Sequence, residues 1–331
     1  MEFFTEDVRK FFLHLENTHR VRTLKEPPPG LTDLCSNDYL CLSKDARIIT
    51  ALKDGIDIDG AGSTASRLVS GHRDVFSALE GAYAKWVGSE DGLFFANGYA
   101  ANVGALSAIM DGSYAAVADR LCHASLMDGI RLSGARKVYF HHNDLDHLEA
   151  LLKKAPEKKR MIVTESLFSM DGDFAPMADL VALAKKYLAL LYVDDAHALG
   201  VYGNAGSGLS LGADFRVGTF GKALGLEGAV VATDALSKRY LLHTARTFVF
   251  STAPLPALAH AALEAIRARG PYAVVLSDMR MPDRDGVSLL EEVRRIAPDT
   301  IRDGSTRPPP SCFTAAAAPS QLAEHIGRVF G

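Results

Sequence analysis

Short apolar segments alternate with segments of helical periodicity between about residues 90 and 235. The apolar segments predict strands at Gly92–Phe95, Ala115–Asp119, Lys137–Phe140, Met161–Glu165, Leu188–Asp194, Arg216–Thr219 and Gly228–Thr233. The periodic segments predict helices at Asn97–Met110, Ala124–Ser133, Asp144–Lys154 and Pro176–Tyr187. This alternation predicts an α/β fold with a mostly parallel sheet that helices cover on both faces. Ligands of such sheets bind at the carboxyl ends of the strands.

The two ends of the chain have a different character. Residues 1–40 predict an N-terminal helical arm, and an extended segment follows the helix and continues to about residue 60. Residues 41–235 predict the large domain. Residues 236–331 predict a smaller, atypical domain, in which an alanine-rich helix follows Pro254 and ends near Arg269. Residues 303–319 have little pattern and predict a loop, and Ser320–Phe330 predicts a last short helix.

Composition and charge narrow the class of protein. The formal net charge is −4, which gives no indication of a nucleic-acid partner. The four cysteines lack the C-x-x-C spacing of a metal or redox site, and they predict reduced thiols. The first residues lack the apolar stretch of a signal peptide, and no run approaches a membrane span. We therefore expect a cytoplasmic protein with no membrane partner.

The first candidate for chemistry is a strand that ends in carboxylates and a histidine. Asp194, Asp195 and His197 directly follow an apolar segment that ends at Val193. A strand-end carboxylate can hold a cationic ring nitrogen, as the pyridinium of pyridoxal phosphate (PLP) requires to act as an electron sink. A lone aspartate in this place more often caps the next turn, so the residue taken alone favours that structural interpretation.

The second candidate is Lys222, which lies in a glycine-rich segment (residues 218–225) just beyond a predicted strand. Glycines permit close backbone approach to a ligand, and a lysine in a confined site can lose its charge, as Schiff-base formation requires. The segment is not a Walker loop, because the required glycine spacing and the serine or threonine are absent. Taken alone, a lysine in such a segment is more often a solvated turn residue.

Three further polar segments follow predicted strands. At Asn97–Tyr99 a strand turns into an alanine-rich helix, whose free amides can bind phosphate. Ser166–Asp173 offers small polar and acidic residues, and His123 follows another strand. Each of these has an ordinary structural explanation, but together the five segments offer what the parts of one PLP molecule need.

The order and wording of these segments resemble the α-oxoamine synthase family of fold type I PLP enzymes. Further similar segments are residues 35–40 (CSNDYL), 62–72 (GSTASRLVSGH) and 251–254 (STAP). The resemblance extends over about residues 15–266. It implies a PLP-binding large domain, followed by a small domain that is shortened in this chain.

The resemblance assigns a role to each residue singled out. Lys222 would carry PLP as a Schiff base and move the proton at the substrate's α-carbon, with Asp194 on the ring nitrogen and His197 on the ring's 3-oxygen. The other implied contacts are His123 on the ring face and on the substrate, Ser169 beside the ring oxygen, Gly98, Tyr99 and Thr219 on the phosphate, Ser251 or Thr252 on the phosphate of a partner subunit, and Asn37 and Arg20 on the substrate.

The implied reaction joins an amino acid to an acyl thioester with loss of carbon dioxide, in a homodimer whose active sites lie at the interface. The segments 194–197 (DDAH) and 219–225 (TFGKALG) favour L-alanine and pimeloyl-CoA or a pimeloyl-carrier protein, which give 8-amino-7-oxononanoate. A glycine C-acetyltransferase-like enzyme is the alternative within the family. No metal site is implied.

The C-terminal part departs from the family. The family's substrate-carboxylate arginine, in an Arg-Leu-Arg-like strand, has no counterpart here. Residues 271–300 instead resemble the middle of a response-regulator receiver domain, with Asp278 at the phosphoacceptor position. A receiver also needs an upstream acidic pair and a downstream lysine, and no lysine follows Lys238. We therefore expect a strand–turn–helix insert rather than signalling, and a PLP-binding but catalytically impaired chimera is the third hypothesis.

Overall fold

The computed structural model describes residues 2–24, 35–157, 159–267, 274–277 and 313–316. The chain divides into two units, residues 1–36 and 37–331. The first contains helix α1 (Glu2–Asn17), which the sequence predicted as a helical arm. Within the described ranges, no helix combines the length and apolar character needed to cross a bilayer. The predicted domain limits at residues 40 and 235 stay predictions.

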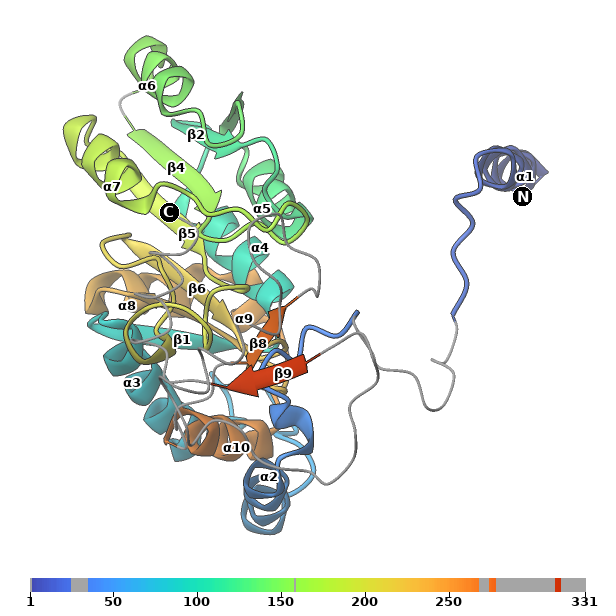
Figure 1. Ribbon diagram of the computed structural model, residues 1–331, viewed down its shortest axis with the longest axis vertical. Coiled ribbons are helices and arrows are strands. Elements are labelled where there is room, and N and C mark those ends of the chain that lie inside the picture. Colours follow the sequence, from blue (N-terminus) through green and yellow to red (C-terminus); the bar gives the residue numbers. More distant parts are fainter. Residues whose placement is uncertain (1, 25–34, 158, 268–273, 278–312, 317–331) are drawn as a thin grey trace. The chain divides into compact units, whose positions relative to one another are not determined.

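The second unit contains an α/β sheet domain (Figure 1). Its main strands are β1 (Asp91–Phe95), β2 (Tyr114–Asp119), β3 (Arg136–Phe140), β4 (Lys159–Glu165), β5 (Leu190–Asp194), β6 (Phe215–Thr219) and β7 (Ala229–Thr233). Its helices are α2 (Ala46–Asp59), α3 (Asp74–Val87), α4 (Gly98–Ile109), α5 (Ala124–Ser133), α6 (Leu145–Lys154), α7 (Met177–Lys186), α8 (Ala235–Thr244), α9 (Arg246–Val249) and α10 (Pro256–Arg267). Two short 3-10 turns, Leu42–Lys44 and Asn204–Gly206, complete it.

The seven strands form one sheet in the order β1-β7-β6-β5-β4-β2-β3. The pairs β2–β3, β2–β4, β4–β5 and β5–β6 are parallel, whereas β7 is antiparallel to both of its neighbours. Because β7 alone is reversed, the carboxyl ends of β1, β2, β4, β5 and β6 lie at the same edge of the sheet. The expected α/β fold with a mostly parallel sheet is confirmed.

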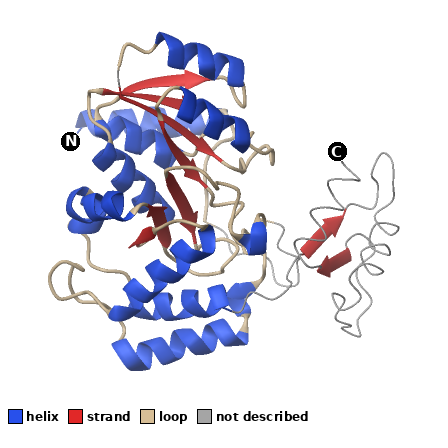
Figure 2. Cartoon of the chain, turned by 90° about the vertical axis from the view of Figure 1, so that its left-hand side faces the viewer, coloured by secondary structure: helices blue, strands red, loops and turns tan. Residues whose placement is uncertain are grey.

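Both faces of the sheet are buried, as a sheet of this class requires. Alternate residues of one strand face different clusters: Tyr192 packs in one core, and Leu191 and Val193 pack in another. Helices α4, α5, α8 and α9 contribute to the first core. On the opposite face α6 packs on β2 and β3, α7 packs on β5, and α3 packs on β1 and β7, with α10 packed on α3 and α2 on α10. Figure 2 shows these helices on either side of the strands.

Most predicted elements agree with the structure to within one or two residues, but two expectations were wrong. The segment before residue 60 was expected to be extended, whereas Ala46–Asp59 forms helix α2, which packs on α10. Residues 303–319 were expected to be loop, whereas Phe313–Ala316 forms β9, antiparallel to β8 (Val274–Ser277). A β-strand at 313–316 requires a partner distant in sequence, which local pattern does not reveal. The expected helix at 320–330 and Asp278 lie outside the described residues.

Candidate active site

The carboxyl ends of four neighbouring or near-neighbouring strands position the candidate residues. Asp194 ends β5, Thr219 ends β6, and Glu165 ends β4 beside Asp194 in the register. Gly98, the first residue of α4, follows β1 after a two-residue turn. Side chains from segments far apart in the sequence therefore meet at one sheet edge, as the order of the strands predicts.

Lys222 ends a chain of hydrogen bonds that runs across the site. Its Nζ lies 2.7 Å from Nε2 of His197, and Nδ1 of His197 lies 2.6 Å from the Tyr39 hydroxyl. The Tyr39 hydroxyl donates to Oδ1 of Asn37 at 3.1 Å, so it accepts from His197 and places the ring proton on Nδ1. Nε2 of His197 is then the acceptor that faces Lys222.

The environment favours uncharged forms of both members of the Lys222–His197 pair. Burial lowers the pKa of Lys222, and the carboxylates of Asp194 and Glu165 oppose that effect without cancelling it. Burial, followed by the nearby Lys222 charge, lowers the pKa of His197 to about 4. At neutral pH His197 is therefore uncharged, and it adds no positive charge beside the lysine.

Asp194 is buried and held by two donors. Oδ2 accepts a hydrogen bond of 2.6 Å from Nδ2 of Asn102, and Oδ1 accepts one of 2.9 Å from the Ala196 N–H. Asn102 is itself fixed, because its Oδ1 accepts from the Tyr192 hydroxyl at 3.0 Å and its Nδ2 also reaches Ser125 Oγ at 2.9 Å. Each carboxylate oxygen keeps a further lone pair, with which Asp194 can bind a cationic ring nitrogen.

His123, which follows β2, contacts Glu165 at the end of β4 and connects a further strand end to the site. The His123 N–H donates to Oε1 of Glu165 at 2.6 Å, and Nδ1 of His123 lies 2.8 Å from Ser125 Oγ at the start of α5. Burial, and next the neighbouring Asp194 carboxylate, raise the pKa of Glu165 to about 8. The Glu165 side chain therefore carries a proton for much of the time near neutral pH, which limits the negative charge beside Asp194.

The start of α4 can bind an anion. The side chain of Asn97 caps the helix by accepting from the Ala100 N–H at 2.9 Å. The amides of Gly98 and Tyr99 precede the first intrahelical hydrogen bonds and point toward the helix start. Gly98 lies beside Thr219, because a Cβ on Gly98 would lie 3.5 Å from the Thr219 hydroxyl oxygen. These groups form a polar corner suited to a phosphate.

The remaining predicted residues lie in varied places. Ser169 is exposed in the loop after β4. Ser251 and Thr252 line a small pocket with Arg67 and Ala96, next to the start of α4. Arg20 belongs to the first unit, where its guanidinium contacts His14 and Thr18, so its predicted substrate contact stays a prediction.

Four residues of this network were not singled out from the sequence. Tyr39 lies in a segment quoted for its resemblance, but its hydroxyl gives no local signal of a contact with His197. Glu165 ends a correctly predicted strand, and a charged residue at a strand end could have indicated a site residue. Asn102 is a polar residue inside an apolar helix, which also could have been noticed, whereas Ser125 has no distinguishing pattern.

Comparison with known proteins identifies the family of this chain. The profile of the aminotransferase class I and II family matches residues 29–280, which is more than half of the chain. The chain belongs to this family. Among curated relatives in the family, 8-amino-7-oxononanoate synthase from Alkalilimnicola ehrlichii is 47% identical over 240 residues, 70% of this chain and 61% of the relative. A putative 8-amino-7-oxononanoate synthase from Bacillus cereus is 45% identical over 262 residues, 77% of this chain and 66% of the relative.

Solved structures with a similar fold include a serine palmitoyltransferase and an 8-amino-7-oxononanoate synthase. A serine palmitoyltransferase from S. paucimobilis with a bound PLP–myriocin aldimine is 30% identical, with a TM-score of 0.68 over 71% of this chain and 62% of that chain. An 8-amino-7-oxononanoate synthase from Francisella tularensis has a TM-score of 0.64 over 92% of this chain and 98% of that chain, and at 23% identity it supports the fold alone. This chain spans 61–66% of the length of the two curated relatives named above.

Proposed function

We propose that this protein is a PLP-dependent acyltransferase that joins L-alanine to pimeloyl-CoA or a pimeloyl-carrier protein, releasing carbon dioxide and 8-amino-7-oxononanoate, a step of biotin synthesis. The observation that carries the proposal is the contact between Lys222 and His197, 2.7 Å apart. In PLP the carbon that binds the lysine and the ring's 3-oxygen occupy neighbouring ring positions. A lysine for the first and a histidine for the second must therefore be adjacent.

The other site residues fit the remaining parts of the cofactor. Asp194, held from behind by Asn102, presents a carboxylate for the ring nitrogen. The amides of Gly98 and Tyr99 and the Thr219 hydroxyl form a corner for the phosphate. His123 offers an imidazole for the ring face. When bound, PLP supplies an electron sink for the negative charge that develops at the amino acid's α-carbon.

The residues of the chain then divide the work of the reaction. Burial keeps part of the Lys222 population neutral, so its amine can attack a carbonyl and later take the proton from the α-carbon of the amino acid. His197 stays neutral, and its contact with the Tyr39 hydroxyl holds its ring in place. Asp194 keeps the ring nitrogen protonated, because a buried carboxylate stabilises the positive charge beside it.

The choice of substrates rests on the relatives and on the segments around Ala196 and Phe220. Both named curated relatives are called 8-amino-7-oxononanoate synthases, one of them putatively. A serine palmitoyltransferase is among the structural relatives, so a different amino acid and acyl thioester is the second candidate. We also propose a homodimer in which Ser251 or Thr252 binds the partner's phosphate; their place in a pocket beside Ala96 and the α4 start supports this.

The test is a visible absorption spectrum of the PLP-loaded protein, recorded before and after L-alanine and pimeloyl-CoA are added. The proposal predicts a cofactor band that changes with L-alanine and changes again with the thioester, together with carbon dioxide release. Glycine with acetyl-CoA, and L-serine with palmitoyl-CoA, are the matched comparisons. Turnover with either pair but not with L-alanine would overturn the substrate assignment. A cofactor band that no amino acid changes would overturn the proposal that the protein is a catalyst.

A further inference from the structure

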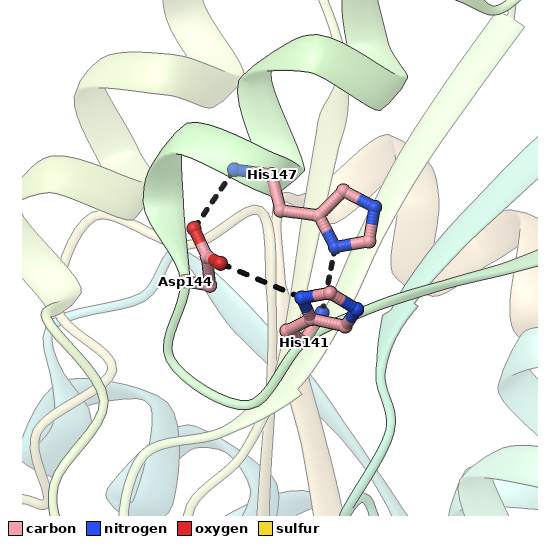
Figure 3. Close-up of side chains that lie close together, drawn as sticks. All are labelled: His141, Asp144 and His147. Atoms are coloured by element: carbon pink, nitrogen blue, oxygen red, sulfur yellow. Dashed lines mark hydrogen bonds and ion pairs between the residues drawn. The ribbon is translucent and has the colours of Figure 1, made fainter.

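Two histidines and an aspartate meet where β3 leads into α6, apart from the residues of the candidate active site. His141 follows β3, Asp144 is the N-cap residue of α6, and His147 lies in the first turn of that helix. One possible ligand atom from each of the three side chains lies within 4.8 Å of the other two. Figure 3 shows the two rings facing each other with the Asp144 carboxylate beside them.

The aspartate is held in place by the helix that it caps. Oδ1 of Asp144 accepts a hydrogen bond of 2.8 Å from the His147 N–H, which leaves Oδ2 directed toward Nδ1 of His141 at 3.6 Å. One anionic ligand is therefore fixed before any ion arrives.

The two imidazoles are close and accessible. Their ring centroids are 4.1 Å apart, and Nδ1 of His147 accepts a hydrogen bond of 3.1 Å from the His141 backbone N–H, so this nitrogen carries no proton. The His141 side chain is 67% exposed, which lets its ring rotate and lets an ion enter from solvent.

We propose that His141, Asp144 and His147 form a surface site for a late first-row divalent metal ion such as Zn²⁺, Ni²⁺ or Cu²⁺. Two imidazole nitrogens and one carboxylate suit these ions, whereas Mg²⁺ and Ca²⁺ prefer oxygen ligands. Metal–ligand distances of about 2.0–2.2 Å bring donor atoms to roughly 3.0–3.4 Å from one another, so the side chains close by about 1 Å. The ion replaces the His141 N–H at Nδ1 of His147, and water bonds the freed N–H instead.

A neighbouring group is less suited to a metal. His142, Asp171 and Asp173 also lie within reach of one another. However, both ring nitrogens of His142 already contact carboxylates, Nδ1 with Asp119 at 3.0 Å and Nε2 with Asp173 at 2.8 Å. An ion at either nitrogen would therefore have to displace one of these carboxylate contacts.

The experiment measures Zn²⁺ binding to the full-length, PLP-loaded protein by equilibrium dialysis with metal analysis. We expect His141→Ala to weaken binding at this site about ten-fold or more, since even indirect partners of a metal ligand contribute that much. The matched control is His243→Ala, which removes another exposed histidine, on α8, and should bind as the unmodified protein does. Excess Mg²⁺ should not compete.

A second measurement identifies the ligands directly. Electron paramagnetic resonance of bound Cu²⁺ should show coupling to two imidazole nitrogens, and to one in His141→Ala. Because His141 is exposed, that variant should fold normally, which circular dichroism checks. Unchanged Zn²⁺ affinity and unchanged nitrogen coupling in both His141→Ala and His147→Ala would overturn the proposal, as would equal competition by Mg²⁺.

Discussion

Replacing Asn102 by leucine tests whether the support behind Asp194 determines cofactor binding. Asn102 is 1% exposed and makes hydrogen bonds to Asp194, Ser125 and Tyr192. Leucine has a similar length and no polar atoms. Asn102→Leu therefore removes the donor to the Asp194 carboxylate and leaves the Tyr192 hydroxyl without its acceptor, while Ser125 keeps its contact with His123.

The size of the effect follows from these lost contacts. A hydrogen bond to a charged group contributes about 1.5–3 kcal/mol, and a buried hydroxyl left without a partner costs about 1–3 kcal/mol. We expect Asn102→Leu to lower the free energy of unfolding of the apoprotein by about 3–5 kcal/mol. A carboxylate that is no longer held should also bind PLP about ten-fold more weakly, which corresponds to about 1.4 kcal/mol.

The assay combines urea unfolding of the apoprotein with a PLP titration followed by visible absorption. Val103→Ala is the matched control, because Val103 is the next residue of α4, is 8% exposed and has no polar side-chain atom with which to hold Asp194. It should cost about 1–3 kcal/mol of stability and leave PLP affinity unchanged. If Asn102→Leu lowered the free energy of unfolding by less than about 1 kcal/mol and bound PLP with unchanged affinity, the proposed support of Asp194 would be wrong.

Three further predictions concern other parts of the structure. Tyr39→Phe should weaken PLP binding several-fold, because His197 loses the partner that fixes its tautomer, and an unchanged PLP titration would argue against this role. Burial alone would lower the pKa of His142, but the carboxylates of Asp119 and Asp173 outweigh it and raise that pKa above 6.5. The contribution of protonated His142 to the free energy of unfolding is therefore complete below about pH 6.5 and is lost as the pH rises through the pKa of His142 in the folded protein. Urea unfolding should show that the unmodified protein loses more stability toward alkaline pH than His142→Gln does. A larger loss in His142→Gln would contradict this prediction. Gly228→Ala should cost about 1–3 kcal/mol in thermal unfolding, because φ is +120° and a Cβ would lie 2.5 Å from the Phe94 ring; unchanged stability would contradict this reasoning.

The sheet could be predicted well because its strands are short apolar segments with clear polar ends. The predicted end of β5 at Asp194 and that of β6 at Thr219 agree with the structure, and these ends position the site. Helix α2 was missed for a physical reason. Ile48, Ile49, Ile56 and Ile58 are β-branched, and Gly55 weakens a helix, so local preference favours extended chain.

Contacts with distant residues decide the structure of α2. A Cβ on Gly55 would lie 2.8 Å from Cα of Ala257, so the glycine allows α2 and α10 to pack closely. Local sequence is also insufficient to predict the whole site. Lys222, His197 and Asp194 could be selected from their local sequence, but the contact of Tyr39 with His197 joins residues 158 positions apart. Only the folded chain shows such a contact.

The central claim is that Lys222 binds PLP covalently, and reduction followed by peptide mapping tests it most directly. The protein is loaded with PLP, treated with borohydride to make the lysine–cofactor bond permanent, digested, and analysed by mass spectrometry. Lys185→Ala, which removes an exposed lysine of α7, is the control and should be labelled as the unmodified protein is. We predict one equivalent of phosphopyridoxyl group on Lys222 and none in Lys222→Ala. Stoichiometric labelling of another lysine, or of none in the folded protein, would contradict the account.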